Sequence, residues 1–255
     1  MDKHLVAIVL PMYNEEESIP FLRVMFDENL TLPSDCEFRI VAVNDGSSDR
    51  TLELITRWAR EKKKVLAVSH TRNMGLGQAI LTGFGEAIRM GSDVVVTMDA
   101  DASHTEAVIS QLVSAVLAGA DIAIASRFAA GGKQVGVPLY RRFFSWGARM
   151  ALRLLFPLEG VTDYTISFRA YRTKMVEYAL SCKEEFLDFK TFAIMVELLL
   201  KMAPFAQKIV EIPICLRYDL KMSSSKLKLG PTLRDYLRLA RLPKAKCQLG
   251  KGLGV

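Results

Sequence analysis

Short apolar runs alternate along the first half of the chain with longer segments in which apolar residues recur every three or four positions. A short apolar run bounded by turn residues is typical of a buried β-strand, and the longer spacing is typical of an amphipathic helix. The predicted strands cover residues 5–10, 38–43, 65–69, 94–98 and 121–126. The predicted helices cover residues 16–29, 50–61, 106–118 and a segment that opens at 72–79 and reaches about residue 90.

The succession of strand–helix units predicts the fold class. Four such units in a row favour an α/β fold with a mostly parallel central sheet and helices on both faces. Ligands bind such sheets at the carboxyl ends of the strands. Three of these ends carry acidic or aromatic side chains, namely Tyr13 and Glu15, Asp45, and Asp99 with Asp101. We expect them to converge on one crevice; the alternative is that each is an ordinary loop residue.

The fourth predicted strand ends in two carboxylates. Asp99 and Asp101 stand one residue apart and repel each other unless a cation lies between them. Mg²⁺ or Mn²⁺ prefers oxygen ligands, and Mg²⁺ typically takes one or two carboxylates and completes its shell with phosphates and water. The pair therefore suggests a metal-bridged diphosphate site. The alternative is a solvated turn in which the aspartates cap the following helix, and His104 also suits a helix N-terminus.

The second half of the chain has a different pattern. Glu197 lies in an apolar helical stretch and should be paired or face a site, because burying an uncompensated carboxylate is costly. Pro213 lies inside a predicted strand and favours an edge position or a bulge. The predicted elements are a helix over 140–156, a turn and strand over 162–171, a helix over 188–201 and a strand over 208–218.

Two basic segments are candidates for surface binding. The 140–156 helix combines an apolar and aromatic stripe with flanking arginines, which is typical of a membrane-interface helix, although a core helix with solvated arginines fits as well. The tail over 220–242 is basic, and its apolar face over 233–240 predicts membrane-surface or partner docking. The serines at 223–225 predict a mobile loop between them.

Composition narrows the classes of function. The 255 residues are 50% apolar, which is enough for one large domain or one domain with an appendage. The net charge of +6 favours an anionic partner such as a nucleotide, a nucleic acid or an acidic membrane. Nucleic acid is the weakest of the three, because no stacking aromatics are interleaved with the basic residues.

Cysteine, histidine and hydropathy patterns add three expectations. The four cysteines show no paired spacing, which argues against a zinc site or a disulfide framework and favours a reducing compartment. The three histidines are far apart, which argues against a histidine metal cluster. We expect neither a signal peptide nor a transmembrane helix, since no apolar stretch reaches about 18 residues.

Several motifs together resemble glycosyltransferase family 2, and within it the soluble dolichol-phosphate mannosyltransferase group. They follow one another in family order over nearly the whole chain. The matching motifs are Pro11-Met-Tyr-Asn-Glu15, Val43-Asn-Asp-Gly-Ser47, Arg72-Asn-x-Gly-x-Gly-x-Ala79, Met98-Asp-Ala-Asp101, Ser126-Arg127, Asp163 with Phe168-Arg-Ala-Tyr171, and Ser225-Lys-Leu227. The resemblance implies a GT-A fold. It also implies an inverting transfer of a sugar, with mannose favoured, from a nucleotide sugar such as GDP-mannose to a polyprenyl or dolichyl phosphate.

The resemblance also implies roles for individual residues. Catalysis would rest on Asp99, Asp101 and Arg127, and the metal would be held by Asp99, Asp101 and Ser103. The acceptor would be held by Arg127, Arg141 and Ser145. The donor would be held by Pro11, Tyr13, Glu15, Val43, Asp45, Met98, Asp99, Ala100, Asp101, Arg217 and Lys226.

Two departures from the family pattern leave the donor open. Mannosyl members usually have glutamine where this chain has Ser103, a shorter metal ligand, and the stretch between Arg217 and Lys226 is longer here. Alternatives are therefore a transferase that uses UDP-glucose or UDP-N-acetylglucosamine, one with a non-lipid acceptor, or a non-catalytic nucleotide-binding module.

The same reading predicts organisation and location. We expect a GT-A domain over 1–219 and a basic loop, amphipathic helix and tail over 220–255. The protein is expected on the cytoplasmic face of a membrane as a peripheral protein, with a membrane-anchoring partner subunit as a further possibility.

Overall fold

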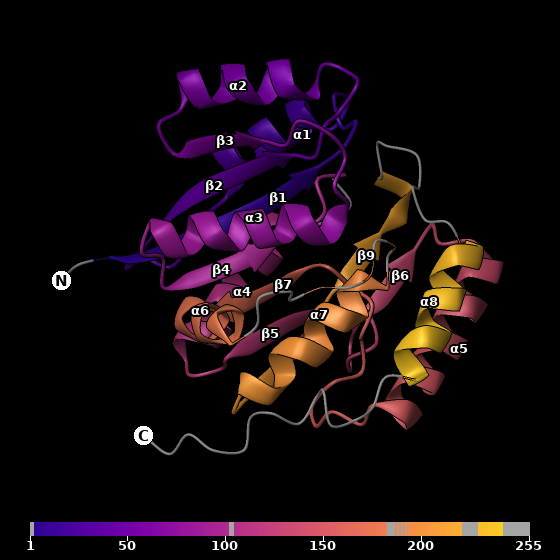
Figure 1. Ribbon diagram of the computed structural model, residues 1–255. Helices are drawn as coiled ribbons and strands as arrows, with labels where there is room; N and C mark the ends of the chain where they lie inside the picture. The colour runs from indigo at the N-terminus through magenta and orange to yellow at the C-terminus, as the bar shows by residue number, and fades with distance from the viewer. Residues whose placement is uncertain are drawn as a thin grey trace.

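A seven-stranded sheet in the order β3-β2-β1-β4-β7-β5-β8 runs through the centre of the molecule (Figure 1). The computed structural model describes residues 3–101, 105–182, 187, 189, 191, 193–220 and 229–241. The sheet strands are β1 His4–Met12, β2 Cys36–Asn44, β3 Val65–Ser69, β4 Val94–Thr97, β5 Ile122–Ser126, β7 Arg169–Arg172 and β8 Ile209–Pro213. The five strands predicted in the first half are confirmed, each within two residues at either end.

Strand direction brings the ligand-binding ends together. β1 pairs in parallel with β2 and β4, β2 pairs in parallel with β3, and β5 pairs in parallel with β8. β7 is antiparallel to both β4 and β5, so every strand except β7 ends at the same edge of the sheet. The register sets Met12 opposite Asn44 and Val9 opposite Thr97. The segments that follow β1, β2 and β4 therefore leave the sheet side by side.

Helices cover both faces of the sheet, as predicted. α3 contacts α6 and α7 on one face, while α1 and α4 lie on the other face and α2 packs beside α1 (Figure 1). A π-helical segment, Met25–Asn29, continues α1. The helices are α1 Ile19–Val24, α2 Thr51–Glu61, α3 Leu76–Arg89, α4 Glu106–Leu117, α5 Leu139–Leu155, α6 Thr173–Ser181, α7 Ile194–Met202 and α8 Leu229–Arg241, with short 3₁₀ turns at Ala203–Phe205 and Tyr218–Leu220.

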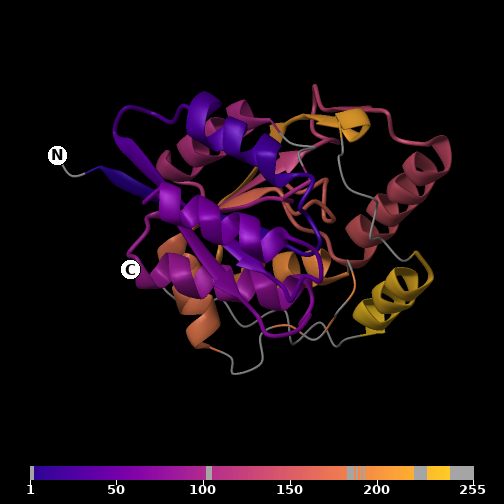
Figure 2. The same ribbon diagram turned by 90° about the horizontal axis from the view of Figure 1, so that it is seen from above.

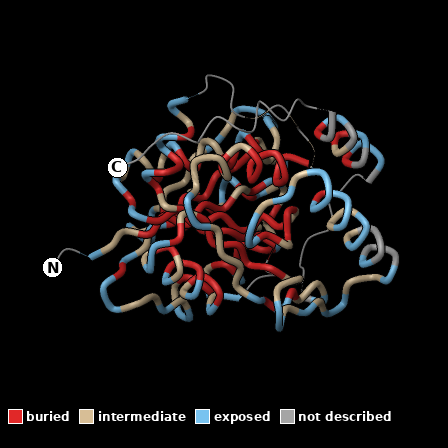
Figure 3. The backbone as a smooth tube through the Cα atoms, turned by 90° about the horizontal axis from the view of Figure 1, so that it is seen from below, coloured by how far each residue is buried: buried red, intermediate tan, exposed pale blue. Residues whose placement is uncertain are grey.

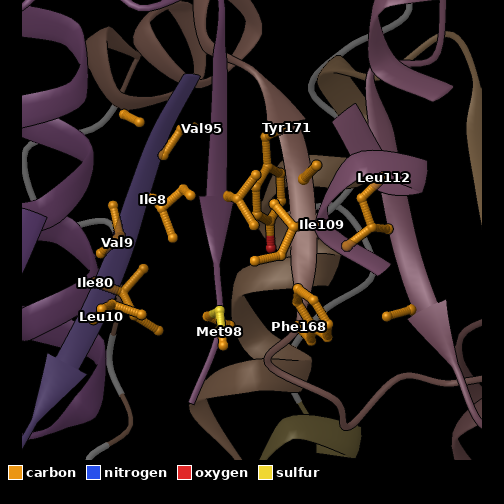
Figure 4. Close-up of a cluster of buried hydrophobic side chains, with 14 of the residues drawn as sticks. Ile8, Val9, Leu10, Ile80, Val95, Met98, Ile109, Leu112, Phe168 and Tyr171 are labelled. Atoms are coloured by element: carbon orange, nitrogen blue, oxygen red, sulfur yellow. The ribbon is translucent and has the colours of Figure 1, made fainter. Parts of the chain in front are cut away.

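The core lies along the sheet and the helix faces that pack on it (Figure 3). Side chains of β1, β4, β7, α3 and α4 meet there (Figure 4). The ring of Phe84 on α3 packs edge-on against Tyr171 on β7, with centroids 5.5 Å apart. Burial of this many apolar side chains is the main stabilising term for such a domain.

The predicted strand over 208–218 is wrong as a single element. It breaks at Ile214 into β8, which forms the edge of the main sheet, and β9 Cys215–Arg217, which pairs with β6 Lys133–Val135 in a separate two-stranded sheet. Pro213 ends β8 at that edge, where its missing N–H removes no ladder bond. Glu197 is paired as expected, with Lys201 Nζ 2.6 Å from its Oε1.

Helices α5 and α8 lie at the same end of the molecule, away from strands β2 and β3 (Figures 1 and 2). α5 exposes large apolar side chains, with Leu139 79%, Trp146 54% and Leu154 84% accessible. α8 turns Thr232, Asp235 and Leu239 inward and exposes Arg234 and Arg238. Among the described residues, none of the helices combines the length and the apolar character that spanning a bilayer requires.

Candidate active site

Hydrogen bonds tie the loop after β1 to the loop after β2. The backbone N–H of Asn14 donates to Ser47 Oγ at 2.9 Å, and that of Glu15 donates to Thr51 Oγ1 at 2.8 Å. Asn14 has a φ of 52°, a left-handed conformation that Asn tolerates better than most residues. The two loops therefore form one wall, on which Tyr13 is exposed and Glu15 is buried.

Asp45 organises a third loop against this wall. Its carboxylate accepts the backbone N–H groups of Met74 and Gly75, each at 2.8 Å. His70 Nδ1 lies 2.8 Å from the same carboxylate, and His70 Nε2 lies 2.9 Å from Thr82 Oγ1. Asp45 thus orders the segment that the sequence analysis described as the start of a helix and as a family motif. His70 and Thr82 were missed as site residues, because the contacts of His70 with Asp45 and with Thr82 are tertiary.

Gly46 explains why this turn needs a residue without a side chain. Its φ is +66°, and a Cβ added there would lie 2.3 Å from the carbonyl carbon of Arg72. Backbone packs on backbone at that point, so any side chain would push the 72–75 loop away. The Asn-Asp-Gly motif is therefore explained by local geometry as well as by ligand chemistry.

The two aspartates follow β4 at the same edge of the sheet. Asp101 is buried with 5% of its surface accessible, Asp99 is partly exposed, and Met98 and Ala100 are buried around them. Among the described residues, no three His, Cys, Asp or Glu side chains gather as a metal site. The two aspartate side chains are hard oxygen donors. They suit Mg²⁺ or Mn²⁺ whose coordination shell is completed by phosphate and water. Ser103, the third predicted ligand, lies outside the described residues.

Arg127 follows β5 at the same edge. Its Nε donates to Asp163 Oδ2 at 2.9 Å, and one Nη donates to Asp163 Oδ1 at 3.2 Å and to Thr165 Oγ1 at 2.6 Å. The Asp163 side chain is fully buried and the Arg127 side chain is 16% exposed. Since β7 lies between them, about 10 Å, or two strand spacings, separates β5, which Arg127 follows, from β4, which the aspartate pair follows.

A second carboxylate supports Asp163 from β8. Glu211 Oε1 accepts the backbone N–H groups of Thr162 and Asp163 at 2.5 and 2.7 Å, and Glu211 Oε2 accepts the Thr162 hydroxyl at 2.6 Å. This arrangement fixes the loop that carries the partner of Arg127. The sequence had flagged Asp163 only as part of a motif and gave no signal for Glu211, because the contact spans 48 residues along the chain.

The remaining predicted residues fall into three groups. Ser145 lies on α5 and is partly exposed, and Pro11 and Val43 lie within β1 and β2 beside the first wall. Arg217 lies on β9, where Asp219 Oδ2 is 2.7 Å from its Nη2. Lys226 and the side chain of Arg141 lie outside the described part of the chain.

Tyr236 on α8 lies close enough to Arg127 and Asp163 to feel their charges. Burial raises the pKa of Tyr236 to about 12, and the charges of Arg127 and Asp163 also act on its hydroxyl. Asp235, the preceding residue, accepts a hydrogen bond from Thr191 Oγ1 at 2.8 Å. Helix α8 is therefore near the Arg127 and Asp163 pair.

Comparison with known proteins identifies the family. The family described as Glycosyl transferase family 2 matches residues 7–179 of this chain. The chain belongs to this family. The matched residues include both loops of the first wall, the aspartate pair, Arg127 and Asp163.

Relatives of this family 2 chain cover most of its length. It is 36% identical over 91% of its residues to a dolichol-phosphate mannosyltransferase of Pyrococcus furiosus, and it spans 62% of the length of that relative. It is 32% identical to an undecaprenyl-phosphate mannosyltransferase of Micrococcus luteus, with 82% of each chain covered.

A solved structure shares the fold. Glucosyl-3-phosphoglycerate synthase from Mycobacterium tuberculosis, in complex with Mn²⁺, UDP and glucosyl-3-phosphoglycerate, superposes with a TM-score of 0.66 at 17% identity. The match covers 99% of the family 2 chain and 83% of the synthase. The predicted GT-A fold is confirmed.

Proposed function

We propose that this chain is an inverting transferase that moves a sugar from a nucleotide sugar such as GDP-mannose to a polyprenyl phosphate, with mannose as the favoured sugar. The observation that carries the proposal is the presence of two oppositely charged sites at one edge of the sheet, Asp99 and Asp101 after β4 and Arg127 after β5. The aspartate pair suits a metal-bound diphosphate, and Arg127 suits a phosphate. The printed names of the two relatives, both polyprenyl-phosphate mannosyltransferases, support this choice of substrates.

The donor occupies the side nearest β1 and β2 in this proposal. Tyr13, Glu15 and the ordered Asp45 turn would bind the nucleoside, and Asp99 and Asp101 would hold the Mg²⁺ or Mn²⁺ that accompanies the diphosphate. The metal, when bound, neutralises the negative charge that grows on the leaving nucleoside diphosphate. The buried position of Asp101 strengthens the electrostatic effect, because charges interact more strongly away from bulk water.

The acceptor phosphate needs positioning rather than activation. A phosphate monoester carries about −1.5 to −2 charges near neutral pH, so it is already a nucleophile and needs no general base. Arg127, with Arg141 and Ser145 from α5, holds it and offsets its repulsion from the donor. Because Asp163 fixes the guanidinium of Arg127 in two directions, this positive charge is preorganised.

A donor screen tests the proposal. GDP-mannose, UDP-glucose and UDP-N-acetylglucosamine are each incubated with polyprenyl phosphate and Mg²⁺ or Mn²⁺, with a chelator control. The UDP sugars are included because the M. tuberculosis neighbour binds UDP. We expect metal-dependent formation of mannosyl-phosphoryl polyprenol. Transfer that is indifferent to the chelator, or absent with every donor, would overturn the proposal.

Location and partners are part of the same proposal. A polyprenyl phosphate acceptor requires the enzyme to sit at a membrane surface, and the exposed apolar side chains of α5 suit such a position. The cytoplasmic face suits the free thiols of Cys36, Cys182 and Cys215. A separate membrane-anchoring subunit would appear as a protein that co-purifies with the chain from solubilised membranes and not from the soluble fraction.

A further inference from the structure

Two guanidinium groups lie over one aromatic ring on the loop after β5. The guanidinium carbon of Arg127 lies 5.1 Å from the centre of the Phe128 ring, and that of Arg149 on α5 lies 4.9 Å from the same centre. An aromatic face attracts cations within about 6 Å. Phe128 therefore holds two arginines from different elements near each other, although their charges repel.

The loop that presents Phe128 is fixed by contacts within the loop itself. The hydroxyl of Ser126, which is buried, accepts the N–H groups of Phe128 at 3.2 Å and Ala129 at 3.0 Å. A Cβ added to Gly132 would lie 2.8 Å from the carbonyl of Arg127, so the loop folds back tightly on itself. The backbone at Phe128 is thus fixed by the turn.

The two arginines differ in how their donors are used. Arg127 has its Nε and one Nη bonded to Asp163 and Thr165. Arg149 Nε is buried without a hydrogen-bond partner, and no carboxylate pairs with Arg149 among the described residues. A guanidinium stays charged and carries five donors, so the unpartnered N–H of Arg149 leaves it with the capacity to bind an anionic oxygen.

Helix geometry places Arg149 next to the proposed acceptor residues. Arg141, Ser145 and Arg149 follow one another at intervals of four on α5, and residues four apart share one face of a helix. Arg142 and Arg153 on the same helix are exposed instead. Arg149 is thus the α5 arginine that the structure joins to the Arg127 loop.

We propose that Arg149 is a further acceptor-binding residue, whose guanidinium holds the acceptor phosphate together with Arg127 while Phe128 fixes the spacing of the two. This inference rests on the proposed function, since it names a residue of the same site. Arg127 contributes a charge already shared with Asp163, whereas no carboxylate of the described part of the chain pairs with the positive charge of Arg149. The phosphate would supply the oxygen that Arg149 Nε lacks.

Steady-state kinetics test the assignment. Arg149→Gln and Arg149→Lys are compared with Arg142→Gln, which removes the same charge from an exposed position of the same helix. A short-chain polyprenyl phosphate in detergent serves as acceptor, so that membrane binding does not enter. We expect Arg149→Gln to raise KM for the acceptor about tenfold to a hundredfold, as for loss of a charged hydrogen bond. The KM for the nucleotide sugar should stay unchanged.

Two further arms identify the ligand group. Arg149→Lys should recover only part of the loss, because lysine is a point charge without the planar fork that stacks on Phe128. Inorganic phosphate should compete with the acceptor in the wild type and compete more weakly in Arg149→Gln. If inorganic phosphate competes equally in both, the interaction depends on the lipid and the assignment to phosphate fails.

The outcomes separate this inference from the function on which it rests. Wild-type chain that transfers no sugar to polyprenyl phosphate refutes the proposed function. Wild-type transfer with an acceptor KM in Arg149→Gln equal to that of Arg142→Gln refutes the role of Arg149 alone. A rise in the donor KM of equal size would assign Arg149 to the diphosphate and would also overturn the inference. If Arg149→Gln does not fold, Arg149→Lys against wild type decides by the same criteria.

Discussion

Asp163 and Asp219 each pair with an arginine through two or more hydrogen bonds, yet their surroundings differ. The Asp163 side chain is fully buried beneath Arg127, whereas the Asp219 side chain is 37% exposed beside Arg217. An ion pair removed from water leaves a strongly unfavourable charge when one partner is lost, while an exposed pair is replaced by water. The same chemical change should therefore have different consequences at the two sites.

Asp163→Asn is expected to lower the free energy of unfolding by about 3 kcal/mol, because it leaves the guanidinium of Arg127 without its counter-ion. Asp219→Asn is the matched control and should leave the unfolding midpoint unchanged. Urea unfolding followed by far-UV circular dichroism measures both. Equal midpoints for the two variants would show that the buried pair contributes no stability.

Asp99→Asn keeps the size of the side chain and removes the charge that the metal needs. We expect turnover to fall by about 10²-fold or more with either Mg²⁺ or Mn²⁺, comparable to the loss of one preorganised electrostatic group. Glu37→Gln, at an exposed position near the start of β2, is the control and should retain full activity. Near-normal transfer by Asp99→Asn with its metal dependence intact would remove Asp99 from the metal site.

For single residues, the sequence predicted where the site residues lie better than it predicted which residues contact them. The acidic and aromatic residues at the ends of β1, β2 and β4 were predicted because each follows an apolar run directly. The pairing of Asp45 with His70 and of Asp163 with Glu211 was not, since these contacts depend on the fold bringing distant loops together. The functional residues could be predicted from local sequence, whereas the tertiary contacts that position them could not.

Among the elements, α3 shows how closely a helix can approach the sheet. A Cβ added to Gly83 would lie 2.1 Å from Val9 Cγ1 on β1, whereas one added to Gly85 on the same helix would meet nothing within 4 Å. The glycine at 83 therefore sets the distance between α3 and the sheet. That distance matters for function because α3 begins directly after the loop that Asp45 orders.

Gly83→Ala should destabilise the protein by about 1–3 kcal/mol through overpacking, and Gly85→Ala should be neutral or stabilise it by up to about 1 kcal/mol through helix propensity. Adding Val9→Ala to Gly83→Ala opens space at the contact, so the double variant should lose less than the sum of the single losses. Thermal and urea unfolding of the four variants measure this coupling. Strict additivity would show that the close approach at Gly83 carries no strain.

The topology was predictable where consecutive units repeat and failed where they do not. The alternation of short apolar runs with helical spacing predicted β1 to β5 and α1 to α4, because each unit buries its own stripe. The insertion of antiparallel β7 between β4 and β5 was not predicted, because strand order depends on long-range pairing. The break between β8 and β9 was also missed, since both flanking segments read as one extended run around Pro213.

Across the whole molecule, apolar exposure and positive charge gather on the side of α5 and α8. α5 exposes Leu139, Trp146, Met150 and Leu154 together with Arg142 and Arg153. We propose that residues 220–255 form a surface-binding unit appended to the GT-A domain over 1–219, with α5 as the membrane-interface helix of that domain. α8, its described portion, links that unit to the active site, because Tyr236 lies within the field of Arg127 and Asp163.

This arrangement predicts a membrane orientation that vesicle flotation can test. Leu154→Glu should lower the partition coefficient onto vesicles at least about tenfold, because full burial of a leucine side chain contributes about 1.5–3 kcal/mol. Phe21→Glu is the matched control, since Phe21 is 50% exposed on α1 at a distance from α5. We expect it to bind vesicles as the wild type does.

Lipid charge and salt separate the two contributions to this binding. The arginines of α5 and α8 should favour anionic over neutral vesicles, and raising the salt concentration should weaken only that preference. The apolar contribution of Leu154 should persist in high salt. If Phe21→Glu loses as much binding as Leu154→Glu, the molecule has no preferred membrane face, and the acceptor phosphate would have to reach Arg127 by a route other than the α5 surface.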